Sequence, residues 1–258
     1  MDPYAGTMHD LTTRFVGRLR ARDPQAWFEL WETFGPILRA QLARWGRGRI
    51  GPETVADLSQ ETLTALSSAI DRHDPSKGAR FSTWLLAIAK YTLSDEMDKR
   101  FAQKRGGGIK PLSLSPQDDD GPRFDVEGGE RPDQEYEAQV FEAKVDAALR
   151  QVERSVGFED FEAFRQRVLE GQAGRTVAAA LGTSEATISR RAGRVREALR
   201  GALSDVFIKY SFTEEDWDEL PRNGLELNPK KGQDASFDEA LAEVWLRASR
   251  RRQQKGRS

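Results

Sequence analysis

The chain contains no cysteine and only two histidines among its 258 residues. Without cysteine the protein has no disulfide, no thiol nucleophile and no sulfur-ligated zinc or iron–sulfur site, which fits a cytoplasmic address. His9 and His73 lie far apart in the sequence, so a metal centre or a histidine-based catalytic triad is a poor interpretation. We therefore expect no metal, no cofactor and no enzymatic activity.

Long apolar runs are missing as well. No stretch approaches the roughly 18 consecutive apolar residues of a membrane span, and the N-terminus lacks the basic-then-apolar pattern of a signal peptide. We therefore expect no membrane insertion. The composition is 38% hydrophobic and 32% charged, so the cores must be small. A chain of this length has room for two small domains.

Apolar residues recur at helical spacing through the first part of the chain, and no strand alternation is sustained. One helix is predicted from Asp23-Pro24, an N-cap followed by proline in the first turn, to about residue 45. Two more are predicted near residues 53–72 and 82–105, joined by turn chemistry at 74–78. Residues 1–105 thus form one all-helical domain.

Residues 106–137 differ from what precedes them. They are rich in glycine, proline and acid, and between Gln117 and Glu137 nine acidic residues stand against two arginines. Such a composition predicts an acidic flexible linker. Two readings stay open: a simple tether between domains, or a segment that occupies a basic channel of nucleic-acid size.

Residues 138–203 are predicted to form a second helical domain that ends in GTSEATISRRAGRVREALRGAL, residues 182–203. A short helix before Gly182, a glycine turn, and a second helix capped by Thr183 or Ser184 make a helix-turn-helix pattern. Five arginines and two glutamates lie between Thr183 and Arg200, although the net charge of the whole chain is only -2. The basic charge is concentrated in this helix.

In a helix-turn-helix the first turns of the second helix face base edges in the major groove. Arginine can bind guanine bidentately and glutamate can accept from cytosine. The alternative is a helical hairpin with a solvated face. The candidate contacts are Ser184, Glu185, Ala186, Ser189, Arg190, Arg191 and Arg194.

Residues 204–258 form a C-terminal extension with an acidic cluster, a loop, and a last helix signalled by the capping box Ser236-Phe-Asp-Glu239. From Arg247 to Ser258 there are six basic residues and no acid. This end can contact phosphate, bind an acidic partner, or be a solvated tail.

Residues 55–100, VADLSQETLTALSSAIDRHDPSKGARFSTWLLAIAKYTLSDEMDKR, resemble the promoter-opening domain (region 2) of bacterial sigma factors. The order of motifs is specific: Asp57-Leu58-Ser59-Gln60-Glu61, then Phe81-Ser-Thr-Trp84-Leu85, then a basic-ended helix, a linker and a helix-turn-helix. With the downstream helix-turn-helix as region 4, the pairing resembles the extracytoplasmic-function (ECF) group. The extension has no counterpart in the minimal family.

The resemblance implies roles for particular residues. The face of Asp57, Leu58, Gln60 and Glu61 would dock on the clamp helices of the largest RNA polymerase subunit, although such a stripe is also typical of a solvated helix. The opened −10 strand would be held by cations and apolar surfaces. The candidates for that role are Asp74, Lys77, Arg80, Phe81, Ser82, Trp84 and Lys90. Phe81 and Trp84 fit core packing equally well, and for Trp84 we favour the core.

Two departures from the family pattern stand out. Tyr91 replaces an asparagine found in many members, and residues 151–172 replace the usual lead into the second domain. The resemblance implies a sigma factor that binds core polymerase, including the flap of its second-largest subunit, recognises the −35 duplex and melts the −10 element, with an anti-sigma factor as a further partner. The alternatives are a stand-alone helix-turn-helix regulator of operator DNA and an adaptor that makes only protein contacts.

Overall fold

The computed structural model describes residues 14–71, 80–104, 133–227 and 234–255. It is 83% helical and has no strand within these ranges, so the all-α prediction is confirmed. None of the described helices is long and apolar enough to cross a membrane. His9, His73 and most of the predicted linker lie outside the described residues.

The chain divides into two compact units, Met1–Val140 and Phe141–Ser258, called here the first unit and the second unit. The division falls within helix α5 (Gln134–Ser155). The first turn of α5 therefore belongs to the first unit, and it includes the last residues of the predicted linker.

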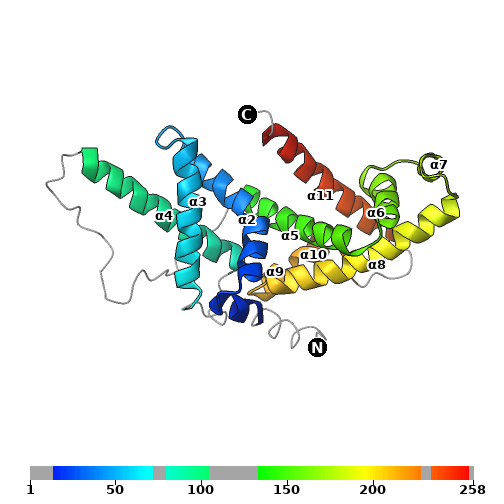
Figure 1. The fold of residues 1–258 in the computed structure, drawn as a ribbon, viewed down its shortest axis with the longest axis horizontal. Helices are drawn as coiled ribbons and strands as arrows, with labels where there is room; N and C mark the ends of the chain where they lie inside the picture. Colours follow the sequence, from blue (N-terminus) through cyan, green and yellow to red (C-terminus); the bar gives the residue numbers. More distant parts are fainter. Residues whose placement is uncertain (1–13, 72–79, 105–132, 228–233, 256–258) are drawn as a thin grey trace. The chain divides into compact units, whose positions relative to one another are not determined.

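Three long helices build the first unit: α2 (Pro24–Trp45), α3 (Pro52–Ala69) and α4 (Phe81–Lys104) (Figure 1). Each packs against the other two. Helix α2 begins where the sequence predicts, because the Asp23 carboxylate accepts from the backbone N–H groups of Gln25 and Ala26. The core is apolar except for a few hydroxyls and the amide of Gln41, and its most buried side chains include Leu30, Phe34, Leu42, Leu66, Leu85 and Ile88.

Two of those hydroxyls join α3 to α4. Thr62 Oγ1 and Thr92 Oγ1 are 2.9 Å apart in the core. Each also lies within hydrogen-bonding distance of a carbonyl of its own helix, Leu58 O for Thr62 and Ala89 O for Thr92. This polar contact carries no net charge.

The second unit continues from α5 through α6 (Phe158–Phe164), a π-helical turn η2 (Arg165–Leu169), α7 (Gly174–Ala180) and α8 (Glu185–Lys209). Two short helices, α9 (Glu214–Trp217) and α10 (Glu219–Arg222), precede α11 (Asp234–Lys255). Helix α8 packs against α6 and α7, and α11 packs against η2. A small cluster joins α6, α7 and α8 at Ala163, Val177, Ala178 and Ile188.

The C-terminal extension is a folded part of the second unit. Helix α8 runs through the predicted boundary at 203/204, and the residues beyond it supply buried apolar side chains: Val206, Phe207, Ile208, Tyr210, Leu220, Leu225, Phe237, Leu241 and Val244. A cap at Ser236 predicts that the last helix starts at Phe237, which is wrong, because α11 already includes Asp234. The Asp234 carboxylate is held there by Arg200.

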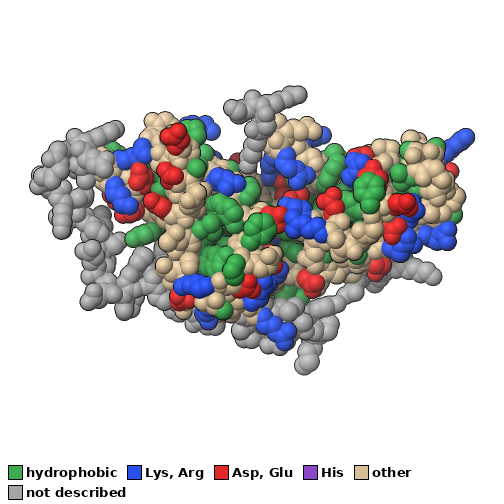
Figure 2. All heavy atoms as spheres, in the orientation of Figure 1, with side chains coloured by type: hydrophobic (Ala, Val, Ile, Leu, Met, Phe, Trp, Pro, Cys, Tyr) green, Lys and Arg blue, Asp and Glu red, His purple; other side chains and the backbone are tan. Residues whose placement is uncertain are grey.

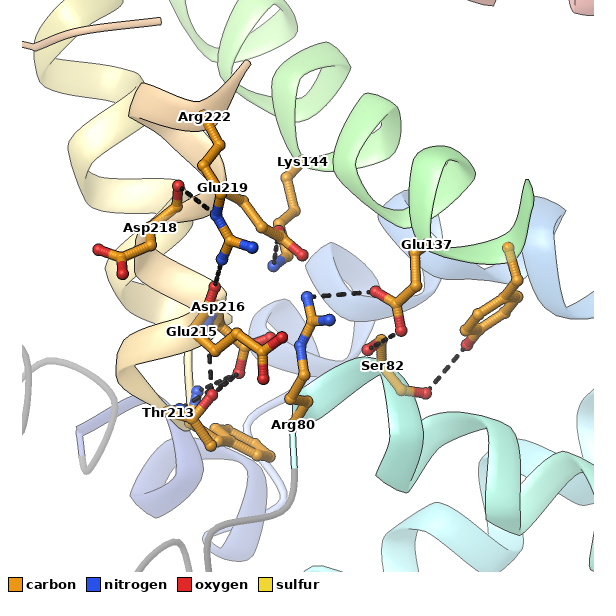
Figure 3. Close-up of polar contacts among 12 residues, drawn as sticks. Arg80, Ser82, Glu137, Lys144, Thr213, Glu215, Asp216, Asp218, Glu219 and Arg222 are labelled. Carbon is orange, nitrogen blue, oxygen red and sulfur yellow. Dashed lines mark hydrogen bonds and ion pairs between the residues drawn. The ribbon is translucent and has the colours of Figure 1, made fainter. Parts of the chain in front are cut away.

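A buried ion pair links α5 to α10 within the second unit. Lys144 is 0% exposed, and its Nζ lies 3.1 Å from Glu219 Oε2 (Figure 3). The same ammonium lies 5.2 Å from the centroid of the Phe207 ring. Since an ammonium without such partners is strongly disfavoured in a core, these contacts are what allow a lysine at this position.

Candidate nucleic-acid interface

The turn between α7 and α8 has the conformation that its sequence predicts. Gly182 has a φ of +60°, in the left-handed region where glycine carries no side-chain penalty. Ser184 then caps α8, because its side chain accepts from the backbone N–H of Thr187 at 3.2 Å. Ile188, Ala192 and Val195 are buried, so the opposite face of α8 is turned outward.

The outward face of α8 carries most of the predicted contact residues. Ser184, Glu185, Ala186, Ser189, Arg190 and Arg194 are exposed, and Arg191 is half-buried. The Arg190 guanidinium donates to Ala186 O at 3.4 Å and to Thr187 Oγ1 at 3.2 Å, both within its own helix. Arg190 is therefore tied to no other helix by these bonds.

The next two arginines are held by carboxylates of α6. Arg194 binds Asp160 with two bonds, Nε to Oδ2 at 3.0 Å and Nη2 to Oδ1 at 2.7 Å, and Arg191 pairs with Glu159. The hydrogen bonds from Arg194 hold the pKa of Asp160 below its usual range. Acidic and basic side chains are interspersed over the face drawn in Figure 2, in keeping with such pairs.

The last two arginines of the basic stripe are held by the C-terminal extension. Arg196 forms a two-bond pair with Asp238 at 2.8 and 2.7 Å, and Arg200 binds Asp234 at 2.6 Å. The Arg200 guanidinium also lies 4.9 Å from the centroid of the Phe237 ring. These two arginines dock α11 on α8, a role that differs from that of Arg190.

In the first unit, the four predicted docking residues lie on two different faces of α3. Asp57, Gln60 and Glu61 are exposed, whereas Leu58 is 1% exposed and lies in the core. Helical spacing explains this, because residues three and four apart share a face and Leu58 lies with Val55, Thr62 and Leu66 on the other. Asp57, Gln60 and Glu61 thus form an exposed polar stripe, and Leu58 packs in the core beneath it.

The start of α4 is mostly buried. Phe81, Ser82 and Trp84 are 1%, 1% and 3% exposed, with the Phe81 ring 4.9 Å from Phe34 and 6.0 Å from Trp84. This is the core position that we favoured for Trp84. Arg80 and Lys90 are half-buried, and the Lys90 ammonium lies 5.5 Å from the Trp45 ring. Asp74 and Lys77 lie outside the described residues.

The first turn of α5 closes over the start of α4. Glu137 Oε1 accepts from Ser82 Oγ at 2.9 Å, and Glu137 Oε2 lies 3.2 Å from Arg80 Nη2 (Figure 3). Tyr136, 1% exposed, donates its hydroxyl to the Ser82 carbonyl at 3.2 Å. Burial raises the pKa of Tyr136 far above its usual range, so this hydroxyl keeps its proton.

A second ion pair fixes the same turn. Asp133 accepts from the Tyr136 backbone N–H at 2.8 Å and also pairs with Arg44 of α2. The hydrogen bond from Arg44 lowers the pKa of Asp133. The acidic residues here are thus paired with arginines, and within the described ranges no group of three or more histidine or acidic side chains is placed to hold a metal ion.

A comparison with known families finds a match for most of this bundle. Residues 30–101 match the model of sigma-70 region 2, from within α2 almost to the end of α4. This segment is similar to sigma-70 region 2. The match supports the interpretation of the protein as a sigma factor. Sigma factors bind RNA polymerase and take part in promoter melting, and they are not enzymes themselves. No curated protein matches the chain.

The matched segment 30–101 contains all the predicted docking residues and all the predicted −10 residues, from Asp57 to Lys90. Their contacts with polymerase and DNA stay predictions. The structure brings Arg80, Ser82 and Trp84 together at the start of α4 and keeps the docking stripe on α3.

Several residues that shape these surfaces have no role in the sequence prediction. Glu137 and Tyr136 were part of a predicted linker, and Asp160, Asp234 and Asp238 had no predicted partner. The sequence does place Asp234 and Asp238 four residues apart, the spacing that puts two side chains on one helix face. That spacing is the signal that could have matched them to the equally spaced Arg196 and Arg200.

Proposed function

We propose that this protein is a sigma factor of the extracytoplasmic-function group, which binds core RNA polymerase in the cytoplasm and directs promoter-specific transcription initiation. The observation that carries the proposal is the region 2 match over the α2–α4 bundle. The helix pair α7 and α8 in the second unit supports it, because such a factor also needs a domain that binds the −35 element as duplex DNA.

Docking on the clamp helices of the largest polymerase subunit is assigned to Asp57, Gln60 and Glu61. Their exposure on one stripe of α3 supports this assignment. Leu58 acts through the core, where it holds the stripe in place. We assign binding of the flap of the second-largest polymerase subunit to the second unit. An anti-sigma factor is a further proposed partner.

The opened −10 strand is assigned to the loop ending at Arg80 and to the first turns of α4. Asp74, Lys77, Arg80, Ser82 and Lys90 supply charge and hydrogen-bonding groups to the strand. Phe81 and Trp84 are buried, so in the structure described they support this surface from the core.

The −35 duplex is assigned to residues 184–194 at the start of α8. Arg190 is the proposed base reader, because its bonds are confined to its own helix and a guanidinium can bind guanine with two hydrogen bonds. Ser184, Glu185, Ala186 and Ser189 complete the exposed first turns. Arg191 and Arg194 are assigned to phosphates.

Run-off transcription tests the proposal. Purified bacterial core polymerase is incubated with and without the full chain on DNA that carries the promoter region of its own gene. A transcript that requires the protein and is lost with Arg190→Glu is expected. Arg154→Glu makes the same charge change at an exposed residue of α5, outside the assigned surfaces, and is the matched control, which should keep the transcript.

Co-purification separates docking from DNA reading. Asp57→Arg combined with Glu61→Arg should abolish binding to core polymerase, whereas Arg190→Glu should leave it intact. Absence of both a transcript and binding to core would contradict the proposal. Tight sequence-specific binding to duplex without polymerase would instead favour a stand-alone regulator.

A further inference from the structure

The carboxylate of Glu137 lies on Arg80 and Ser82, two groups that the proposed function assigns to DNA. Ser82 Oγ donates to Glu137 Oε1 at 2.9 Å, whereas the buried Oε2 has no hydrogen bond and faces Arg80 Nη2 at 3.2 Å in an ion pair (Figure 3). The side chains of Arg80 and Glu137 are 20% and 19% exposed. A hydroxyl that donates to one oxygen and a guanidinium that faces the other form an anion site, and the Glu137 carboxylate occupies it with one of its oxygens incompletely satisfied.

The groups of this site also suit a phosphate. Arginine and serine are frequent donors to the phosphate oxygens of a nucleic-acid backbone, and a phosphodiester presents two free oxygens much as a carboxylate does. Arg80 and Ser82 lie at the beginning of α4, a helix of 24 residues, where the helix dipole also favours an anion. We propose that Arg80 and Ser82 bind a backbone phosphate of the opened promoter strand, and that Glu137 occupies their site until DNA displaces it.

The inference rests on the proposed function and adds to it a phosphate site and a competitor within the chain. The competitor is the segment 133–137, called here the α5 start. Tyr136 anchors it to the Ser82 carbonyl, and Asp133 anchors it to Arg44. Ser82 is 1% exposed with Tyr136 and Glu137 bound to it, so a phosphate reaches its hydroxyl only when the α5 start moves away. DNA and the α5 start therefore bind this surface in exclusion of one another.

Binding of the full chain to a fluorescein-labelled single-stranded oligonucleotide of mixed sequence, followed by anisotropy, tests the proposal. Glu137→Gln removes the competing charge and keeps the side-chain shape. It should raise the affinity roughly threefold to tenfold. The log–log salt slope should stay nearly the same, because the same phosphate contact forms in both proteins once DNA is bound.

Glu135→Gln is the matched control. It removes the same charge from the same helix, but the Glu135 carboxylate is 69% exposed and lies 3.6 Å from Arg44, not on Arg80. A gain equal to that of Glu137→Gln would mean general electrostatics and would overturn the site. Arg80→Gln added to Glu137→Gln should return the affinity to the wild-type value or below, and a retained gain would also overturn the proposal.

A cross-link tests displacement without altering the site, and the absence of cysteine makes it specific. Cysteines are introduced at Arg44 and Asp133 and bridged with a short bismaleimide, which ties the α5 start to α2. The bridged protein should lose single-strand binding relative to the same protein left unbridged. Equal binding in both forms would show that the α5 start need not leave. Arg44→Cys alone, treated with the reagent, is the control.

These results separate the inference from the function that it rests on. If the protein supports transcription but Glu137→Gln changes nothing, the phosphate site is wrong and the sigma assignment stands. If Glu137→Gln raises single-strand affinity while core polymerase is not bound, the site stands and the sigma assignment falls. Failure of both the wild type and Glu137→Gln to bind the oligonucleotide would overturn the site. Thermal unfolding monitored by circular dichroism establishes that each variant is folded.

Discussion

The first unit and the second unit hold their helices together by different means. In the first, α2, α3 and α4 meet through apolar side chains and an uncharged hydroxyl pair, Thr62 and Thr92. In the second, a lysine–glutamate pair is buried in the core, and arginines of α8 are bound by carboxylates of α6 and α11. Charge lies at the edge of the first unit and inside the second.

This difference bears on DNA binding as well as stability. An arginine that is bound by two hydrogen bonds to a carboxylate has fewer donors left for a base. In α8 the structural pairs take Arg196 and Arg200, the α6 carboxylates take part of Arg191 and Arg194, and Arg190 keeps contacts only to its own helix among those described above. A basic helix therefore divides its arginines between folding and recognition.

The largest effect is expected at the buried pair. Lys144→Met leaves the Glu219 carboxylate in the core without its ammonium, which should lower the free energy of unfolding of the second unit by about 3–5 kcal/mol. Hydrogen exchange measured by mass spectrometry can follow α5 and α10 separately from the first unit. The double variant Lys144→Met, Glu219→Leu should recover most of the loss. If Lys144→Met left the stability of the second unit unchanged, the buried ion pair would not distinguish the two units energetically.

The docking of α11 should come next. Phe237 is 1% exposed and lies under the Arg200 guanidinium, so Phe237→Ala should destabilise the attachment of α11 by about 3 kcal/mol. Faster exchange in α11 and η2 is the expected signature. Leu246→Ala, on the same helix but 42% exposed, should change exchange little. If only α11 exchanges faster while η2 and α8 stay protected, the extension is separable from the rest of the unit.

A smaller effect is expected in the first unit. Thr62→Val removes one hydroxyl of the pair and keeps the side-chain shape, so the free energy of unfolding of the first unit should fall by about 1 kcal/mol. Urea unfolding followed by exchange in α3 and α4 measures it. Thr64→Val, an exposed threonine of α3, is the control. A loss as large as that of Lys144→Met would erase the contrast between a neutral and a charged polar contact.

The smallest effect is expected at Asp160. Asp160→Asn removes the charge that holds Arg194, so a DNA phosphate can take the place of the carboxylate. The affinity for duplex DNA should therefore rise roughly threefold, and the log–log salt slope should become steeper by about 0.9. Electrophoretic titration at several salt concentrations measures both. Glu197→Gln, a 73% exposed residue of α8 that contacts Arg200, should change neither. A fall in affinity would mean that Asp160 positions Arg194 for DNA.

Local patterns alone were sufficient to predict the long helices, the α3 stripe and the outward face of α8, but not the short helices α9 and α10, which lie where the sequence suggests an acidic cluster and a loop. The Asp23 cap, the Gly182 turn and the Ser184 cap depend on neighbours a few residues away, and the structure has all three. Helical spacing likewise places Asp57, Gln60 and Glu61 on an exposed stripe. The region 2 resemblance rests on such local motifs, and the family match covers them.

Only the tertiary structure decided which charges are paired. Glu137 lies 55 residues from Ser82 in the chain, Arg196 lies 42 from Asp238, and Lys144 lies 75 from Glu219. Nothing in the spacing within one helix selects such partners, because they are set by which helices pack together and in what register. The sequence by itself determined an all-helical chain with a basic helix and an acidic segment. The fold decided that Arg196 and Arg200 serve packing, that Arg190 does not, and that the end of the acidic segment lies on Arg80.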